Sequence, residues 1–279
     1  MASPEPARLE VRGLGFRYGD RAVLHNVDLN VEPGEVVGLL GPNGSGKSTM
    51  IKLLSGVLRH DAGRIHLDGT DLRSIERRDL ARRVAVVPQE MSFGFPFSAI
   101  EVVLMGRHPH LAGLAFEAEA DLESAREALR RCGAERFATR IITELSAGER
   151  QRVVFAKALA QDTPVLLLDE PASFLDIRHQ VELYDIVREA VEQKRIAVLT
   201  VMHDLNLAAE YCDRVYLLRE GRIEAHGMTE EVMTYANLTR VFGTDVYVDV
   251  NALTGKLLVV PLSGRVQARL RDSEDSSRR

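Results

Sequence analysis

The sequence predicts an α/β fold with a mostly parallel core sheet, an N-terminal antiparallel β-subdomain and an inserted helical subdomain. Residues 9–31 alternate apolar and polar side chains around a Gly-Asp turn, as paired antiparallel strands do. Continuous apolar runs alternate with helical patterns over 35–56 and again after residue 163, which is typical of parallel strands covered on both faces. Between these regions, residues 98–161 show almost only helical periodicity.

The elements of the first half follow from short local patterns. The apolar run EVVGLL (35–40) predicts a strand, and KSTMIKLLSG (47–56) predicts a helix that Gly56 closes. The segments GRIHLDG and VAVVPQ are further expected strands.

In the second half, strands and helices are expected to alternate. PVLLLDEP predicts a strand, 177–194 a helix, IAVLTVMHD a strand, and a helix then runs through Tyr211 before RVYLLREGRI. DVYVDVNALTGKLLVVPL predicts a closing hairpin turned at Thr254 and Gly255. Residues 1–8 are expected to be a flexible tail and 265–279 a disordered one, which leaves 9–264 as one domain with the helical subdomain inserted at about 98–161.

The composition is that of an ordinary globular protein, with 279 residues, 45% hydrophobic and 28% charged. A net charge of -5 gives no overall electrostatic reason for binding nucleic acid, so no nucleic-acid partner is expected. Cys132 and Cys212 each complete an apolar helical stripe and are expected to be buried and reduced. No apolar run approaches the roughly 18 residues of a membrane span, so any membrane role is expected to be peripheral.

The segment GPNGSGKST fits the phosphate-binding pattern G-x-x-x-x-G-K-[ST] and lies between an expected strand and an expected helix. Its glycines let backbone N–H groups surround phosphate oxygens, Lys47 supplies a mobile positive charge, and Ser48 offers a hydroxyl to Mg²⁺. The predicted nucleotide-binding residues of this P-loop are Gly41, Pro42, Asn43, Gly44, Ser45, Gly46, Lys47, Ser48 and Thr49.

Two carboxylates end the apolar strand in PVLLLDEP, at the edge of the sheet where ligands of open α/β folds bind. Asp169 is expected to hold Mg²⁺. Glu170 is free for general-base work on the attacking water, because it is not used by the metal. Together with the P-loop, this pair predicts binding of ATP or GTP with Mg²⁺, and hydrolysis.

The segment ELSAGERQRVVF (144–155) predicts the start of a helix. Ser146 is the expected N-cap and Glu149 follows three residues later, which is the spacing of a capping box. From the residues alone, this segment is either only a helix start or half of an anion-binding site at the positive end of the helix.

Four segments, GPNGSGKST, LSAGERQR, LLLDEPASFLD and VMHDL, stand in an order and spacing that resembles the ATP-binding cassette (ABC) ATPases, over about residues 9–264. The resemblance implies a P-loop NTPase fold, ATP and Mg²⁺ as cofactors, and a homodimer that sandwiches ATP. It also implies that a signature segment faces the ATP held by the other subunit, formed by Leu145, Ser146, Ala147, Gly148 and Glu149.

The same resemblance implies roles for single residues. Tyr18 matches the aromatic that stacks on adenine, although by spacing alone it could be an ordinary strand tyrosine. Gln89 matches the glutamine that senses the metal and lytic water and relays their state to a membrane partner, and His203 matches the histidine that contacts the γ-phosphate. Asp176 matches an aspartate at the dimer interface. The implied catalytic residues are Glu170, His203 and Gln89, and the implied metal ligands are Ser48, Gln89 and Asp169.

Two positions depart from the family's usual LSGGQ signature. Ala147 replaces a glycine, and alanine suits the first turn of a helix. Glu149 replaces a glutamine and brings negative charge near any bound phosphate, which Arg150 and Arg152 are expected to offset. Phe174, in SFLD, is bulkier than the usual alanine.

The stretch SFGFPFSAIEVVLMGRHPHLAG (92–113) is read as exposed aromatics, a short amphipathic helix and a basic loop. It is either an aromatic packing loop, with Phe93, Phe95 and Phe97, or a partner-binding surface. His108 and His110 alone make an incomplete metal-ligand set. The stretch resembles the ATPases of importers for ferric siderophores, haem and cobalamin, which carry GR-x-PH here, and LVVPL near the C-terminus is similar to them too.

This second resemblance implies an ATPase subunit at the cytoplasmic face of the cell membrane. Its partners would be integral-membrane permease subunits and, indirectly, an extracytoplasmic substrate-binding protein; its cargo would be an iron chelate, as a ferric siderophore or haem, or cobalamin. A soluble, non-transport ABC ATPase of an assembly or repair pathway is the alternative. A metabolic P-loop kinase is a further one, but it would have no use for the motif at 146–148.

Overall fold

The core of the protein is a six-stranded sheet in the order β10-β9-β3-β8-β7-β6, and the computed structural model describes residues 5–89, 91, 93–111 and 118–266. From β9 to β6 all neighbours are parallel, whereas β10 pairs antiparallel with β9. Every residue of β3, β7 and β8 is buried, which explains their unbroken apolar sequences. The strands are β3 (Val36–Leu40), β6 (Val84–Val87), β7 (Val165–Asp169), β8 (Ala197–Val201), β9 (Arg214–Arg219) and β10 (Arg222–Met228).

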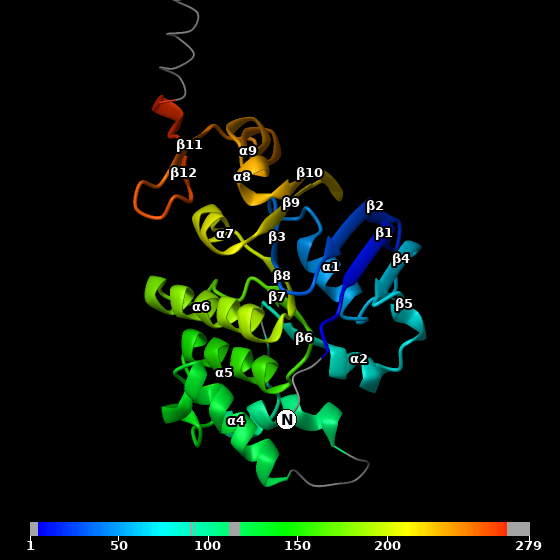
Figure 1. Ribbon diagram of the computed structural model, residues 1–279, viewed down its shortest axis with the longest axis vertical. Coiled ribbons are helices and arrows are strands. Elements are labelled where there is room, and N and C mark those ends of the chain that lie inside the picture. The colour runs from blue at the N-terminus through cyan, green and yellow to red at the C-terminus, as the bar shows by residue number, and fades with distance from the viewer. Residues whose placement is uncertain (1–4, 90, 92, 112–117, 267–279) are drawn as a thin grey trace, which may run out of the picture.

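A four-stranded antiparallel sheet lies beside this core, on the right of Figure 1. Its order is β2-β1-β4-β5, and α1 (Lys47–Leu54) lies between the two sheets, where Met50, Leu53 and Leu54 join a core shared with both. The predicted antiparallel pairing of residues 9–31 is confirmed. The strands are β1 (Leu9–Tyr18), β2 (Arg21–Val31), β4 (Ala62–Leu67) and β5 (Thr70–Asp71).

The predicted helical insertion is also present, at the bottom of Figure 1. Its three α-helices pack on one another, and α5 also contacts β6 of the core sheet. The elements are α3 (Ala99–Leu104), η2 (Met105–His110), α4 (Glu119–Arg131), η3 (Glu135–Phe137), η4 (Ile142–Glu144) and α5 (Ala147–Ala160).

The C-terminal part contains the expected hairpin and several helices that the sequence did not predict. The hairpin turns through Asn251 and Gly255, whose backbone groups bond each other. Residues that form α8 and α9, and η1 and α2 in the first half of the chain, had no assignment, because these elements are only three to eight residues long. The remaining elements are η1 (Leu72–Ser74), α2 (Arg77–Arg83), α6 (Ile177–Lys194), α7 (Leu205–Tyr211), α8 (Thr229–Val232), α9 (Tyr235–Phe242), β11 (Val246–Val250) and β12 (Leu257–Pro261).

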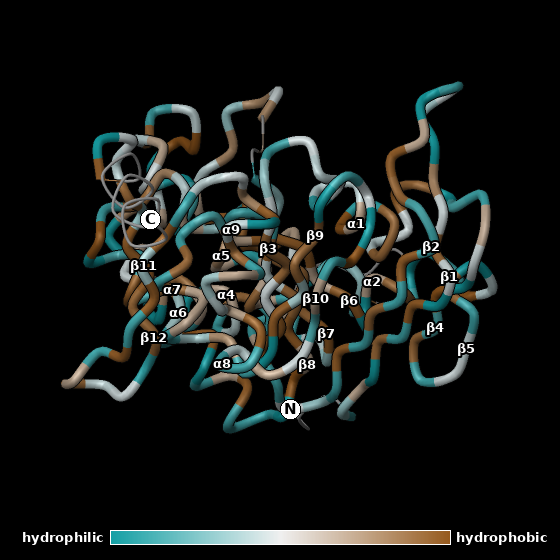
Figure 2. Tube along the Cα trace, turned by 90° about the horizontal axis from the view of Figure 1, so that it is seen from above, coloured by the Kyte–Doolittle hydropathy of each residue, from teal (hydrophilic) through white to brown (hydrophobic). Residues whose placement is uncertain are grey.

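Apolar chain segments gather in the middle of the molecule in Figure 2, around β3, β7 and β9, while the outer loops are mostly hydrophilic. Cys132 and Cys212 are buried and unpaired with each other, as predicted, and burial raises the pKa of each thiol to about 12. No helix within the described ranges has the length and apolar character of a membrane span.

The two expected tails lie mostly outside the described residues, at 1–4 and 267–279. Within the first tail, Ala7 is buried and the Arg8 N–H donates to Asp68 Oδ1 at 2.7 Å. Residues 7 and 8 are therefore anchored to the turn between β4 and β5.

Candidate functional site

The P-loop joins the carboxyl end of β3 to the N-terminus of α1, as the motif requires. Gly44 and Gly46 have φ values of 76° and 110°, in the region that favours glycine. The Lys47 ammonium is buried and donates to Gly41 O at 2.7 Å and Pro42 O at 3.0 Å. Burial lowers the pKa of Lys47, and the nearby carboxylates of Glu170 and Asp169 oppose this change.

The loop has the chemistry to hold a phosphate chain. Ser45 Oγ is buried and has no hydrogen-bond partner among the described residues. An anion would accept hydrogen bonds from this buried hydroxyl, from the N–H groups at the start of α1 and from Lys47.

Ser48 and Asp169 lie side by side, so that a hydroxyl oxygen and a carboxylate oxygen are available to the same cation. The Ser48 hydroxyl donates to Asp169 Oδ1 at 3.0 Å, and only 5% of Asp169 is exposed. Burial raises the pKa of Asp169, while the Ser48 hydrogen bond opposes the change. Hydroxyl and carboxylate oxygens suit Mg²⁺, which keeps several ligands from water and substrate phosphate. Within the described residues, no group of three or more His, Cys, Asp or Glu side chains could hold a metal ion.

Glu170 is held between the ends of neighbouring strands. Gln89 Nε2, just after β6, donates to Glu170 Oε2 at 2.7 Å, and His203 Nε2, just after β8, lies 2.6 Å from Oε1. The Glu170 backbone has a φ of 52°, and its N–H donates to Val201 O at 3.1 Å. The strained turn after β7 thus aims the carboxylate at both neighbours.

A cavity of about 580 Å³ brings together Tyr18, most of the P-loop from Asn43 to Thr49, Gln89, Glu170 and His203. Arg21 and Val23, on β2, also line it and were not predicted. The available signal was the alternation of β2, since Arg21 pairs with Tyr18 across the hairpin and therefore shares its face. The lining residues are Tyr18, Arg21, Val23, Asn43, Gly44, Gly46, Lys47, Ser48, Thr49, Gln89, Glu170 and His203.

The turn between β9 and β10 ties the P-loop to β2. The Gly221 N–H donates to Ser45 O at 3.0 Å, and Gly221 O accepts from the His25 N–H at 2.9 Å. A Cβ at Gly221 would lie 2.1 Å from Val23 O, so the turn can approach this closely only with glycine.

The predicted capping box at the start of α5 is confirmed. Glu149 Oε2 accepts from both the N–H and the hydroxyl of Ser146 at 2.9 Å, and the Glu149 N–H donates to Ser146 Oγ at 3.3 Å. The backbone and hydroxyl bonds from Ser146 hold the pKa of Glu149 below its usual range. The signature residues 145–149 do not line the cavity of their own chain, and Ser146 and Ala147 are exposed.

The arginine that lies nearest to Glu149 in the structure is Arg140, which was not predicted, and not Arg150. Arg150 Nη2 donates to Leu145 O at 3.1 Å, whereas Arg140 Nη1 lies 3.9 Å from Glu149 Oε1. Arg152 acts on Glu149 only at longer range, because its Nη1 donates to Gly133 O.

Asp176 is the N-cap of α6 and is exposed. Its Oδ1 accepts from the His179 N–H at 2.9 Å and lies 2.6 Å from His179 Nδ1. Phe174, two residues earlier, is half exposed, and its carbonyl oxygen would lie 3.1 Å from a Cβ on Gly148. The loop before α6 therefore packs beside the start of α5 within one chain.

The aromatic stretch is less exposed than predicted. Phe95 is 70% exposed, but Phe93 and Phe97 are half-buried against the core, because their chain segment lies against the helical insertion. The expectation of three exposed aromatics is wrong for these two. Ser92, Ala112 and Gly113 of the same stretch lie outside the described residues.

The GRHPH segment that follows covers the C-terminus of α5. A Cβ at Gly106 would lie 2.3 Å from Lys157 O, Arg107 Nη1 donates to Ala160 O at 2.7 Å, and His110 Nε2 lies 2.7 Å from Gln161 O. The last backbone carbonyls of a helix have no hydrogen-bond donors within the helix, and this segment supplies donors to them. Arg107 is consequently buried, not part of a basic surface.

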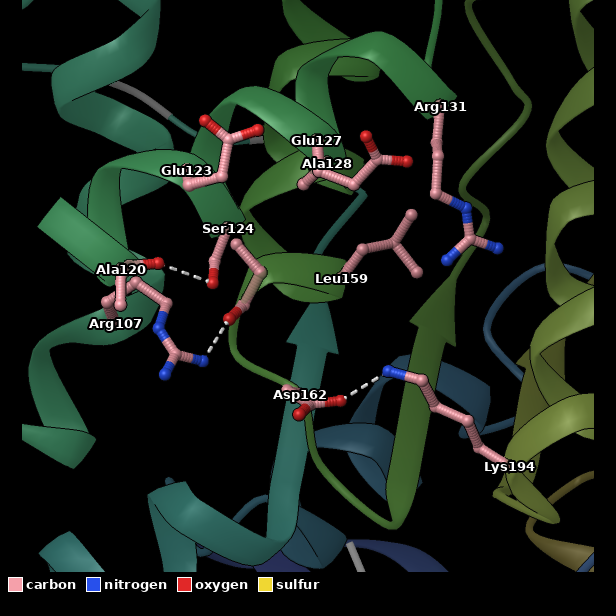
Figure 3. A pocket seen from close by; sticks show the side chains of 11 residues that line it. Arg107, Ala120, Glu123, Ser124, Glu127, Ala128, Arg131, Leu159, Asp162 and Lys194 are labelled. Carbon is pink, nitrogen blue, oxygen red and sulfur yellow. Dashed lines mark hydrogen bonds and ion pairs between the residues drawn. The ribbon is translucent and has the colours of Figure 1, made fainter. Parts of the chain in front are cut away.

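A second hollow of about 490 Å³ lies between α4 and the ends of α5 and α6, as Figure 3 shows. Its charged side chains largely satisfy one another or nearby groups: Asp162 pairs with Lys194, Arg131 with Glu189, and Arg107 with Asp121. None of the predicted site residues lines it.

Comparisons with known proteins agree with this geometry. The family model described as "ABC transporter" matches residues 24–173. The chain is 44% identical over 257 residues to the hemin import ATP-binding protein HmuV of Pseudomonas entomophila, covering 90% of this chain and 99% of that protein. It is 39% identical over 260 residues to the cobalamin import ATP-binding protein BtuD of Halobacterium salinarum, covering 93% of this chain but spanning only 65% of that protein's length.

Two solved structures are similar as well. A metal-chelate type ABC transporter in an inward-facing conformation matches with a TM-score of 0.81 and 28% identity, covering 94% of this chain and 100% of the other. The dimeric, post-hydrolysis ATP-binding cassette MJ0796 with ADP and Pi matches with a TM-score of 0.72 and 28% identity, covering 79% of this chain and 98% of the other.

Proposed function

Because this chain belongs to the ABC transporter family of ATP-binding proteins, we propose that it is the ATP-hydrolysing subunit of an ABC importer. The observation that carries the proposal is the single cavity in which the P-loop, the adenine-side Tyr18, Glu170, Gln89 and His203 meet. The relatives' names, in turn, support import.

Within this proposal each residue has a defined task. Tyr18 stacks on adenine, and the P-loop amides with Lys47 hold the phosphates. Ser48 and Asp169, with Gln89, would hold Mg²⁺, which would supply positive charge to the phosphate chain. Glu170 accepts the proton of the attacking water, and His203 contacts the γ-phosphate.

Both oxygens of Glu170 have a neighbour in the structure. In the structure one oxygen accepts from Gln89 and the other lies against His203, so we propose that the attacking water takes the place of one of these neighbours. This proposed exchange gives nucleotide binding a direct effect on Gln89, the residue assigned to relay the state of the site.

A homodimer is part of the proposal. Ser146 lies at the exposed start of α5 and away from the cavity of its own chain, which suits a role at the ATP of a second copy. Asp176, exposed at the start of α6, is proposed to lie in the same interface. Dimeric cassettes among the similar structures support this arrangement.

The proposed partners are integral-membrane permease subunits, with an extracytoplasmic binding protein acting through them, so the chain would work at the cytoplasmic face of the cell membrane. Phe95, exposed after Gln89, is the proposed start of the permease contact. The proposed cargo is an iron chelate, as haem or a ferric siderophore, or cobalamin, since relatives are named for hemin and cobalamin import.

The deciding experiment is reconstitution of the chain with its permease and binding protein in vesicles. ATP turnover should rise on adding one of the three cargo classes with the binding protein and not the others. Turnover by the isolated chain that no membrane partner changes would favour the soluble, non-transport ABC ATPase.

A further inference from the structure

Arg21 is a cation on the wall of the nucleotide cavity that no part of the predicted site includes. It begins β2, directly opposite Tyr18 in the β1–β2 hairpin, and both side chains line the cavity. Val23 lies on the same face of β2, one repeat or roughly 7 Å further along. Val23 Cγ1 would lie 3.5 Å from a Cβ on Gly46, so this face of β2 runs from Tyr18 towards the P-loop.

The Arg21 side chain is exposed and has neither a hydrogen-bond nor an ion-pair partner within the part of the chain that the structure describes. Its neighbour Arg17 is also exposed, but it lies on another face of the hairpin and has a hydrogen-bond partner. Arg17 pairs with Ala22 in the register, so it lies on the opposite face of the hairpin, and its guanidinium donates to Asp20 O at 3.5 Å.

The charges around the cavity leave a role for a second cation. Two carboxylates lie at the cavity: Glu170 lines it, and Asp169 contacts the lining residue Ser48. Apart from Arg21 and His203, the only basic side chain among the described lining residues is Lys47. Lys47 already donates to two P-loop carbonyls. A nucleotide polyphosphate carries several negative charges, and a guanidinium binds phosphate oxygens through two parallel N–H groups.

We propose that Arg21 binds the phosphate chain of the nucleotide from the β2 wall of the cavity, reaching along the face that leads to the P-loop. The proposal rests on the proposed function, because it assigns a further contact to the same nucleotide. Arg21 then strengthens binding without touching the water or the transferred phosphoryl group, so it is a binding residue and not a catalytic one.

The test uses the full chain with Mg²⁺ and compares wild type, Arg21→Gln, Arg21→Lys and the control Arg17→Gln. Titrations give Kd for ATP and ADP, competition gives the affinity for adenosine, and turnover gives KM and kcat. Arg21→Gln should raise the Kd for ATP and ADP about 5- to 10-fold, the order expected for a solvent-exposed charge-assisted bond. KM should rise by a similar factor with kcat unchanged, because the contact acts equally in ground and transition states.

The remaining variants and ligands separate the possible outcomes. Arg21→Lys should recover part of the loss, and Arg17→Gln should match the wild type. Equal ATP affinity in wild type and Arg21→Gln would overturn the proposal, as would an equal loss for adenosine, which has no phosphate. Wild-type protein and Arg17→Gln that both fail to bind ATP would instead overturn the proposed function.

Discussion

At the scale of single residues, the site is a set of polar groups that hold one another in place before any nucleotide arrives. Glu170 is shared by Gln89 and His203, and Asp169 accepts from Ser48. Such pairs keep buried polar atoms satisfied, and each has to be exchanged for contacts with nucleotide, metal or water. Substitutions that keep the shape of one of these side chains but remove its charge should therefore affect nucleotide binding and hydrolysis to different extents.

The first residue prediction concerns Glu170→Gln. The amide keeps the shape of the side chain but cannot take a proton from water, so hydrolysis should fall about 100- to 10,000-fold. Binding of ATP should remain, and the ATP-bound dimer should accumulate. Turnover, ATP titration and sedimentation measure these effects, with the exposed Glu123→Gln as control. Wild-type turnover in Glu170→Gln would refute the assignment.

The second residue prediction concerns the pH dependence of Asp169. Because burial raises its pKa in the folded chain, its contribution to stability is full below the ordinary value of 3.8 and is lost as pH rises through the folded pKa. Asp169→Asn cannot ionise, so without nucleotide it should be more stable than wild type at pH 7, and the gap should shrink towards acid pH.

Denaturant unfolding between about pH 4.5 and 7.5 measures this gap. The same variant should lose the extra stabilisation that Mg²⁺ adds to bound ATP, because one of the three proposed metal ligands, and the charged one in direct contact with Ser48, is gone. A gap that is constant with pH would contradict the assigned cause.

At the scale of elements, the cavity depends on segments that are distant in sequence. The β9–β10 turn bonds both the P-loop, at Ser45, and β2, at His25. The P-loop is thus supported from outside its own strand and helix, and the face of β2 that carries Arg21 and Val23 is fixed relative to it.

Gly221→Ala tests this support. The added methyl group meets Val23 O and forces the turn away from β2, so KM for ATP should rise about tenfold, with a loss of about 1–3 kcal/mol in the free energy of unfolding. Gly255→Ala is the matched control, since Gly255 has a similar positive φ but no atom near its Cβ position. It should lose some stability and keep KM. Equal effects of both substitutions on KM would show that the contact with β2 does not matter.

At the scale of the whole molecule, the start of α5 stands apart from the cavity of its own chain. Ser146 is exposed and fully engaged in a capping box, which accounts for the helix but not for the surrounding signature. If its second role lies at the ATP of another copy, one subunit can be folded and bound to ATP and still be inactive.

Ser146→Arg tests that role. The bulky cation should abolish hydrolysis and ATP-dependent dimerisation while each monomer still binds ATP. The lost cap should also cost about 1 kcal/mol, so the unfolding free energy is measured alongside turnover. Thr143→Arg, an exposed position three residues earlier, is the control and should retain activity. Surviving turnover in Ser146→Arg would leave the segment as a cap alone.

Local sequence patterns by themselves determined the main strands, the longer helices and the phosphate chemistry. Alternating apolar and polar residues predicted the β1–β2 pair, and unbroken apolar runs predicted β3, β7 and β8. The capping box of Ser146 and Glu149 is present, as the spacing of the two residues predicted. These features depend on neighbours a few residues apart, whose geometry is set by the backbone period. The order of the four motifs was likewise enough to indicate the ABC transporter family.

Only the tertiary structure decided which distant residues meet. It brought Arg21 into the cavity, joined Gly221 to Ser45, turned Arg107 inward and half-buried Phe93 and Phe97. No local pattern encodes these contacts, because each depends on how two sheets and a helical insertion pack together. The physical reason is that burial and hydrogen bonding are satisfied over the whole molecule, whereas a sequence pattern records only what its own segment needs.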